Sequence, residues 1–464
     1  TMKTTKLFFM AALALMTAAC SNDDNELPTQ QPQKAEGIPF TATISIDNGT
    51  TTRALAENGT TIEATWADGE TVALIYDAGG TPAKTEAEVT KQTDGTATIS
   101  ATLEAGATDG SDVTIIYPAT AADGTTGNVK ADLLAAQDGT LTGTGGTSIA
   151  EKYDVRKGSG KLSISGGTAT VNNGTAGTPV SLTNQFAIFK FTLDGVSIDA
   201  THPLVIKDGT SNETITTVKP ASTATSVYAA MPAAASSTYK FVITTADNKY
   251  IKSGTATIEA GKYYQTSLSM TTPRYPLALS SATVDDLGSV ACAVGHLHME
   301  KTAVPAGCTA VGIVGKVMET GHGLILSLQD ATDQNWNTIN GWAGASYAST
   351  TLKVLPDDAA LGSLTGYTSL GTIPVSNWAV AQKSDYEAIF INLGSTTSNS
   401  NGTVPDIRVN AYFTTNVGGT EISTDSSVHY WSATDAGGGT AWRFRYWYNN
   451  YKTTTYRVRP VLGF

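Results

Sequence analysis

The sequence has few charged residues and very little cysteine. Charged residues make up 15% of the chain, against roughly one quarter in a typical soluble domain. Three cysteines are too few for a disulfide scaffold. The net charge of −12 excludes a general nucleic-acid binder, because neutralising phosphates requires a basic face. After residue 20, no apolar run approaches the roughly 20 residues that a membrane-spanning helix needs.

Glycine is abundant, at 45 of 464 residues, and it separates short segments that read as strands. Residues 38–46 alternate apolar and polar side chains, which predicts a half-buried strand. Further strand-like segments are 71–76, 97–103, 113–117, 162–165, 186–193, 204–207, 239–244 and 263–270. Only residues 130–136 in this half look helical. Many short strands with turn residues between them predict a mainly β fold of β-sandwich type.

The N-terminal segment has the order of an export signal. Lys3 and Lys6 precede an apolar run, and small residues then lead to Cys20. This pattern resembles a bacterial lipoprotein signal and predicts a signal peptide over 1–19 with lipidation of Cys20, which would anchor the chain in the outer membrane. An ordinary secretory signal ending before a chance cysteine is the alternative. The acidic residues that follow Cys20 resemble the surface-export signal of Bacteroidia-type lipoproteins.

A single basic residue, Arg53, lies between Lys34 and Lys84. A trypsin-like protease acting on an exposed loop would therefore have one target there, between Arg53 and Ala54. The cut would release the lipid anchor together with strand 38–46 and leave an apolar groove with unpaired backbone groups. Such an edge is a template for a strand of another chain. The alternative is an ordinary surface arginine.

Several segments over about 36–272 resemble the fimbrillin family of Bacteroidia type V pili. They are Trp66 to Glu70, Val113 to Pro118, Gln137 to Leu141, Lys152 to Asp154, Leu182 to Leu193 and Ala260 to Tyr264. The resemblance implies two β-sandwich domains, here 54–160 and 161–272, preceded by a lipid-anchored segment over 20–53 with a removable strand. It also implies lipoprotein export, trimming after Arg53 and polymerisation by strand exchange with other pilus subunits.

Residues 273–464 differ in composition from the rest and are expected to form a separate domain. Six of the seven tryptophans and four of the five histidines lie here. The stretches Tyr430 to Thr434, Ala441 to Phe444 and Val458 to Val461 resemble the C-type-lectin-like domains of bacterial surface proteins. Asn377 to Val380, before Ser384 to Glu387, resembles their helix-entry motif without its proline. The resemblance implies an α+β ligand-binding domain.

The most informative stretch runs from Ala441 to Arg459, which has seven aromatic residues, five basic ones and no acid. Trp442 and Phe444 share one strand face and are expected in the core. Tyrosine, tryptophan and asparagine give rigid contact area and adaptable hydrogen bonds, as in antibody paratopes. A hydrophobic strand pair with snorkelling arginines is the alternative. The candidate ligand-binding residues are Arg443, Arg445, Tyr446, Trp447, Tyr448, Asn449, Asn450 and Tyr451.

Other constellations do not predict chemistry. His296 and His298 lie on one strand face at a spacing compatible with a metal, but no convincing further ligands follow, so we expect structural histidines, no metal site and no cofactor. Cys292 and Cys308 of an exported chain are a candidate disulfide, with two buried thiols as the alternative. No cysteine follows Cys308 and no carboxylate pair is nominated, so an enzyme is not expected.

Together these observations favour a pilus tip adhesin. A tip subunit needs only to accept a donor strand, so its C-terminal domain is free to bind a glycan or protein on a host or bacterial surface. The expected location is the outer-membrane surface and then the pilus. The alternative is a non-polymerising surface lipoprotein that binds glycans or proteins directly.

Overall fold

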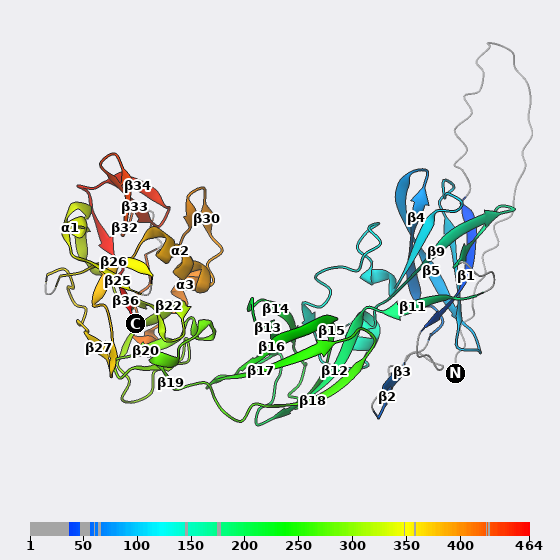
Figure 1. Ribbon diagram of the computed structural model, residues 1–464, viewed down its shortest axis with the longest axis horizontal. Helices are drawn as coiled ribbons and strands as arrows, with labels where there is room; N and C mark the ends of the chain where they lie inside the picture. The colour runs from blue at the N-terminus through cyan, green and yellow to red at the C-terminus, as the bar shows by residue number, and fades with distance from the viewer. Residues whose placement is uncertain are drawn as a thin grey trace, which may run out of the picture.

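The computed structural model describes residues 37–46, 56–59, 61–63, 66–143, 147–173, 178–347, 349–356, 359–423, 425 and 427–464. They form three units that follow one another along the long axis of the molecule (Figure 1). Each unit has its own cluster of buried apolar side chains, and a fourth cluster joins the first two units. None of the helices in the described part of the chain has the length and hydropathy needed to cross a bilayer.

The first unit is an eight-stranded sheet in the order β10-β1-β11-β9-β7-β4-β5-β6. Strand β1 also pairs with β6, so the sheet closes on itself around a core that includes Leu74, Ile99 and Ile115. The strands are β1 (Ile38–Ile46), β4 (Thr71–Ala78), β5 (Thr81–Lys91), β6 (Ala97–Leu103), β7 (Asp112–Tyr117), β9 (Arg156–Ser165), β10 (Thr168–Asn172) and β11 (Val180–Asn184). A separate hairpin joins β2 (Ala56–Asn58) to β3 (Thr61–Glu63).

The second unit packs two sheets around Phe191, Leu204 and Ile243. One sheet contains β15 (Ser226–Pro232), β12 (Phe186–Asp194) and β18 (Tyr263–Ser269). The other contains β17 (Lys249–Ile258), β16 (Ala234–Thr244), β13 (Leu204–Asp208), β14 (Thr214–Val218) and β8 (Ala136–Gln137). Strand β8 precedes β9 of the first unit in the chain, yet it pairs with β14. The first two units are therefore interleaved along the sequence.

The third unit combines two sheets with three α-helices. Its large sheet contains β19 (Leu277–Ala278), β21 (His296–His298), β20 (Val290–Cys292), β22 (Ala310–Glu319), β23 (His322–Ser327), β36 (Val461–Gly463), β29 (Trp378–Val380), β26 (Thr350–Val354) and β25 (Gly344–Tyr347). Its second sheet contains β24 (Ala331–Asn335), β35 (Thr455–Val458), β32 (Tyr430–Gly437), β33 (Thr440–Phe444) and β34 (Tyr448–Tyr451). Helix α2 lies against strands of both sheets, so it holds the sheet that carries the C-terminal aromatic residues.

The remaining elements are short. The helices are α1 (Trp336–Gly341), α2 (Lys383–Asn392) and α3 (Ile407–Asn410). Two small hairpins pair β27 (Ser369–Leu370) with β28 (Ile373–Pro374) and β30 (Ser398–Asn399) with β31 (Gly402–Thr403). Single helical turns are Ala119–Ala121, Ile149–Tyr153, Leu279–Ser281, Val284–Asp286 and Thr415–Val417.

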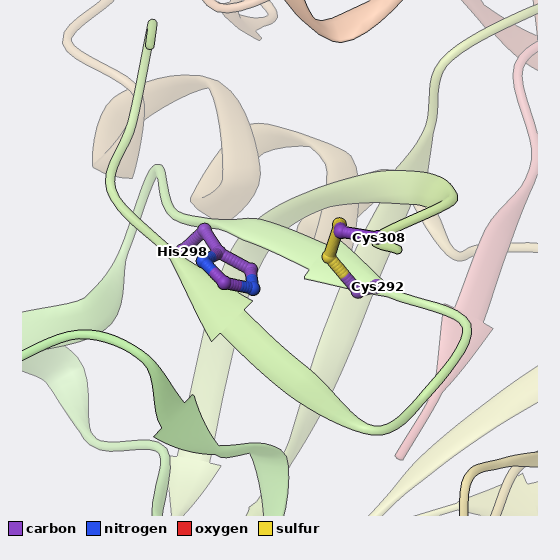
Figure 2. Close-up of side chains that lie close together, drawn as sticks. All are labelled: Cys292, His298 and Cys308. Carbon is purple, nitrogen blue, oxygen red and sulfur yellow. A yellow bond between two sulfur atoms is a disulfide. The ribbon is translucent and has the colours of Figure 1, made fainter. Parts of the chain in front are cut away.

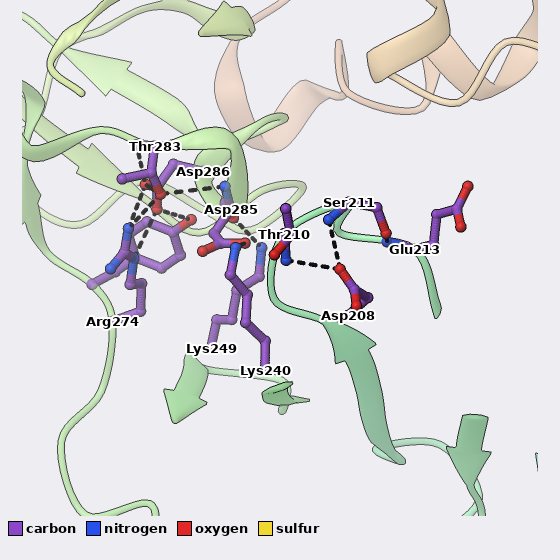
Figure 3. A network of polar contacts seen from close by, with 11 residues as sticks. Asp208, Thr210, Ser211, Glu213, Lys240, Lys249, Arg274, Thr283, Asp285 and Asp286 are labelled. Atoms are coloured by element: carbon purple, nitrogen blue, oxygen red, sulfur yellow. Dashed lines mark hydrogen bonds and ion pairs between the residues drawn. The ribbon is translucent and has the colours of Figure 1, made fainter. Parts of the chain in front are cut away.

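A network of ion pairs joins the second unit to the third (Figure 3). Asp286 is fully buried and accepts hydrogen bonds from Arg274 Nε and Nη2 at 2.9 and 2.6 Å. Lys240 Nζ of β16 lies 3.0 Å from an Asp285 carboxylate oxygen, and Lys249 Nζ of β17 lies 3.3 Å from a Glu300 carboxylate oxygen. The Asp286 carboxylate raises the pKa of Arg274, because it stabilises the charged guanidinium. The third unit is thus held at the end of the second by charges from both sides.

The mainly β fold is as predicted, and each segment that the sequence nominated as a strand lies in a strand of the structure. Helix α2 follows the segment that resembles a helix-entry motif. Two expectations are wrong. Residues 130–136 form turns and the start of β8 instead of a helix, because Leu133 and Leu134 pack into the cluster between the first two units. The expected boundary between residues 160 and 161 lies inside β9, because β9 to β11 complete the first sheet; the second unit takes over at β12.

Candidate functional site

The hairpin of β33 and β34 presents tyrosines to solvent. The exposed fractions of Tyr446, Tyr448 and Tyr451 are 39%, 56% and 69%. These three lie within six residues of one another, and Asn449 between them is also exposed. A tyrosine combines a rigid apolar ring with a polar tip and loses little conformational entropy on contact. The hairpin therefore offers a compact surface suited to contact with a ligand.

The two faces of this sheet have different surroundings. Phe444 is fully buried and packs on Tyr430 and on the α2 residues Tyr386 and Phe390. Trp442 packs at the edge of the same core, as its spacing predicted. On the other face, Arg443 lies opposite Trp431 in β32 and opposite Tyr448 in β34. Cross-strand partners share a face, so Arg443 and Tyr448 point to the same side of the sheet.

Trp447 is not part of the exposed surface, which corrects the sequence-based nomination. Its side chain is fully buried and contacts the ring of Phe444. The indole Nε1 donates a hydrogen bond to the Thr403 carbonyl oxygen in β31. Neighbouring positions in the sequence placed Trp447 among the candidates, but the backbone turns at residues 445–447, where Arg445 and Trp447 have positive φ. That turn directs the indole into the core.

Arg443 lies beside a histidine and a tyrosine that the sequence analysis did not nominate. The Arg443 guanidinium lies 5.3 Å from the centre of the Tyr456 ring, and the His429 ring lies 5.2 Å from the same ring. Burial lowers the pKa of Arg443, and burial together with Arg443 and Arg445 lowers the pKa of His429 to about 4. Nε and Nη1 of Arg443 and Nδ1 of His429 are buried and have no hydrogen-bond partner among the residues that the structure describes.

The other nominated residues divide between exposure and internal contacts. Arg445 stacks over the Tyr446 ring at 4.7 Å, and its Nε donates a hydrogen bond to the Asp425 carbonyl oxygen. Asn450 is half-buried and donates from Nδ2 to the Tyr456 hydroxyl. Tyr446, Tyr448, Asn449 and Tyr451 are exposed. All of them except Trp447 thus lie exposed or half-buried on one hairpin, with Arg443, Tyr448 and Asn450 on one face and Asn449 and Tyr451 on the other.

Strand β1 is the second site of interest. It pairs antiparallel with β6 from Ile38 opposite Leu103 to Ile44 opposite Ala97. On its other edge it pairs in parallel with β10 and β11. Phe40, Ala42 and Ile44 are buried and the threonines between them are exposed. Strand β1 is therefore inserted between two neighbours and does not lie on an edge of the sheet.

Cys20, Arg53 and Ala54 lie outside the described residues. The hairpin that follows them, β2 to β3, contacts the second unit through Glu57. The Glu57 carboxylate accepts hydrogen bonds from Lys190, Tyr228, Tyr263 and Gln265 on the sheet of β15, β12 and β18. The hydrogen bond from Lys190 is the largest cause that lowers the pKa of Glu57 to about 2, followed by those from the two tyrosines. Downstream of Arg53, the chain is thus tied to the second unit.

Cys292 and Cys308 form a disulfide, with His298 of β21 beside it (Figure 2). The ligand atoms of all three residues lie within 4.8 Å of one another. Sulfurs bonded to each other are not thiolates, and the thiolate is the form that binds a metal. His296 is exposed and His298 is half-buried, with a pKa lowered by burial. In its oxidised form this cluster is a staple between β20 and the loop before β22.

No family model and no curated protein matches this chain. Among solved structures, it is similar to a fimbrial protein from Bacteroides ovatus, at 14% identity over 93% of this chain and 100% of that chain, with a TM-score of 0.26. A candidate cell adhesion protein from Bacteroides fragilis matches at 12% identity over 50% of this chain and 92% of that chain, with a TM-score of 0.27. Another from Parabacteroides distasonis matches at 11% identity over 51% and 93%, with a TM-score of 0.26.

Proposed function

We propose that this chain is a pilus tip adhesin of the fimbrillin type. It is exported through a signal peptide over 1–19 and anchored in the outer membrane by a lipid on Cys20. A trypsin-like protease cuts between Arg53 and Ala54, and the vacated place of β1 accepts a strand from another pilus subunit. The unit over 273–464, proposed to be C-type-lectin-like, is carried at the distal end and binds a surface glycan or protein.

The observation that carries the assembly half of this proposal is the position of β1. Burying the side chains of Phe40 and Ile44 stabilises the first unit by about 1.5–3 kcal/mol each. Loss of the strand would expose this apolar slot together with the unpaired edges of β6 and β11. An unpaired edge beside an apolar groove is what an extended peptide recognises when it adds to a sheet. The slot would therefore have high affinity for a strand of the same alternation.

The contacts of Glu57 support the same sequence of events. The cut separates β1 from β2, and the β2–β3 hairpin stays held to the second unit by Lys190, Tyr228 and Tyr263. The part of the chain after Ala54 would thus stay in place while the part before it leaves. Strand β36 pairs on both sides, with β23 and β29, so this strand of the third unit is not available as a donor.

The adhesive half is supported by the hairpin of β33 and β34. It lies in the unit at the far end of the molecule from β1 (Figure 1), so a donor strand that takes the place of β1 would not cover it. Three exposed tyrosines on one short hairpin are more apolar contact area than a single surface aromatic provides. Such a surface suits a sugar ring or a protein loop.

The test begins with trypsin-like cleavage of the folded protein and intact-mass analysis. The expected product begins at Ala54, and the Arg53→Ala variant is expected to stay uncut under the same conditions. A labelled peptide with the sequence of Ile38–Ile46 should bind the cut protein and not the uncut one. The matched control peptide carries Ile44→Asp, which places a charge in the apolar slot and should not bind.

A first cut elsewhere, or equal binding of the peptide to cut and uncut protein, would remove strand exchange from the proposal. The alternative, a non-polymerising surface lipoprotein, would then remain, with binding through the third unit alone. N-terminal sequencing of sheared surface material separates the two, because only the pilus subunit loses residues 38–46 in cells.

A further inference from the structure

The face of the β32–β33–β34 sheet that holds Arg443 and Tyr448 carries a cation that no acid neutralises within the described residues. Arg443 is half-buried, and Nε and Nη1 of its guanidinium are shielded from water without a hydrogen-bond partner. His429 Nδ1, next to the same Tyr456 ring, is in the same state. A desolvated polar group without a partner is unfavourable, and more so when it is charged. Such a group calls for a partner, which is a water, an ion or a ligand group.

The other basic residues of this stretch have partners, so the unpaired state is specific to Arg443. Lys452 pairs with Asp435 at 2.7 Å. Arg457 and Arg459 both pair with Asp330. Arg445 donates to the Asp425 carbonyl oxygen. Arg443 instead lies over the Tyr456 ring, which supports a cation without neutralising it.

The surroundings define the chemistry of the missing partner. A guanidinium presents a planar fork that fits two oxygens of a carboxylate or a sulfate. A neutral imidazole offers one N–H donor and takes up a second proton more readily when an anion lies beside it. Tyr448, opposite Arg443 on the same face, offers an exposed ring, and Asn450, two residues further along β34, places its amide on that face.

We propose that Arg443, His429 and Tyr456 form a subsite for the carboxylate or sulfate of an acidic saccharide, one ring of which contacts Tyr448. This rests on the proposed adhesive function and names its ligand class. A saccharide fits better than an acidic peptide, because the rings of Tyr448 and Tyr456 lie beside the cation and, among the residues that the structure describes, this stretch presents no second unpaired cation for a row of carboxylates. The net charge of −12 also disfavours general binding of polyanions.

The experiment uses the full chain and paired probes at physiological ionic strength. For the carboxylate, 3′-sialyllactose is compared with lactose; for the sulfate, a sulfated dextran oligosaccharide is compared with the same unsulfated oligosaccharide; hexaglutamate represents an acidic peptide. Calorimetry should show binding of at least one acidic saccharide and weaker binding of its neutral counterpart. Arg443→Met should reduce that affinity about 10-fold or more, because a hydrogen-bonded charge is lost.

Control variants separate this site from charge in general. Arg443→Lys keeps the charge without the fork and should give an intermediate affinity. His429→Gln should weaken binding less than Arg443→Met. Lys252→Gln removes one exposed charge on β17 of the second unit and should leave the affinity unchanged. The thermal midpoint of each variant is measured first, so that loss of binding is not confused with loss of fold.

Equal affinity of the original protein and Arg443→Met for every acidic saccharide would overturn the inference. So would binding of hexaglutamate as tight as that of the saccharides. If Tyr448→Ala/Tyr451→Ala abolishes attachment of the protein to bacterial or host cells while Arg443→Met does not, the acidic subsite is wrong and the adhesive function stands. If neither variant changes attachment, both the subsite and the adhesive surface are wrong.

Discussion

At the scale of single residues, the partly exposed charges of Glu57 and Arg443 differ in their hydrogen-bond partners. Glu57 is surrounded by donors, with Lys190 Nζ at 2.8 and 2.9 Å and the hydroxyl of Tyr228 at 2.6 Å. Arg443 lies over the Tyr456 ring, and its Nε and Nη1 have no hydrogen-bond partner among the described residues. The hydrogen bonds that Glu57 accepts stabilise the folded protein. The buried guanidinium nitrogens of Arg443 make no such bonds, so a ligand that accepts hydrogen bonds from them would be stabilised there. The hydrogen-bond partners of a charged side chain therefore separate a structural role from a ligand-binding role better than its residue type does.

Glu57 makes docking of the β2–β3 hairpin dependent on pH. Its pKa in the folded protein is about 2, below the ordinary value of 4.5. The stabilisation is thus fully present above pH 4.5 and is lost as the pH falls through about 2. We expect the thermal midpoint of the original protein to fall more steeply over this interval than that of Glu57→Gln, as measured by scanning calorimetry. Glu213→Gln, at an exposed glutamate, is the control; parallel curves for Glu57→Gln and the original protein would contradict the expectation.

At the scale of elements, β1 pairs along both of its edges with strands that lie far apart in the sequence. Strand β6 pairs with one edge of β1, and β10 and β11, which come much later in the chain, pair with the other edge. Closure of the first sheet therefore depends on a strand that is connected to the rest of its unit only through residues 47–55. A strand held by both edges yet separable by one cut is the feature on which strand exchange depends.

Removing one buried side chain from β1 should destabilise the first unit strongly. We expect Ile44→Ala to lower the free energy of unfolding by about 2–5 kcal/mol, because it leaves a cavity among well-packed neighbours. Thr43→Val, at the adjacent exposed position, should change it by less than about 0.5 kcal/mol. Urea denaturation of the uncut protein measures both. Equal effects would mean that β1 contributes little to the core.

At the scale of the whole molecule, the units are joined by different means. The first and second share apolar side chains, among them Ile116, Tyr153 and Ala230, so they pack as a pair. The second and third meet where Lys240 pairs with Asp285 (Figure 3) and Lys249 pairs with Glu300. Beside these pairs Arg274 donates its backbone N–H to the Lys249 carbonyl oxygen and pairs with Asp286 through its guanidinium. The interface between the first and second units is stabilised by burial of apolar side chains. The interface between the second and third units depends on each buried charge having its partner.

Breaking the buried pair at the second joint should loosen it. In Asp286→Asn, Arg274 keeps a charge with no carboxylate opposite, and removing one partner of a buried pair costs about 3–5 kcal/mol. We expect a broader distribution of overall dimensions by small-angle scattering and a lower unfolding midpoint for the third unit. Asp333→Asn, at an exposed aspartate of the same unit, should change neither. An unchanged scattering profile for Asp286→Asn would show that the joint does not depend on this pair.

Local patterns in the sequence determined much of this protein. Strict alternation predicted β1, because a strand with one face in the core must place apolar residues at every second position. Short strand-like runs between turn residues predicted further strands. The aromatic and basic residues after Ala441 marked a candidate binding surface, and Tyr446, Tyr448 and Tyr451 of that stretch are exposed. The pairing of Cys292 with Cys308 was open in the sequence and is present in the fold.

Tertiary structure alone decided which of those residues face one another. Trp447 enters the core because a turn with positive φ reverses its direction, and period-2 reasoning does not extend through a turn. Strand β8 joins the second unit because its pairing partner β14 comes much later in the chain. His429, Arg443 and Tyr456 come from three segments and meet only when β32, β33 and β35 assemble into one sheet. Residue order encodes periodicity within a strand, whereas juxtaposition between strands depends on pairing across long loops.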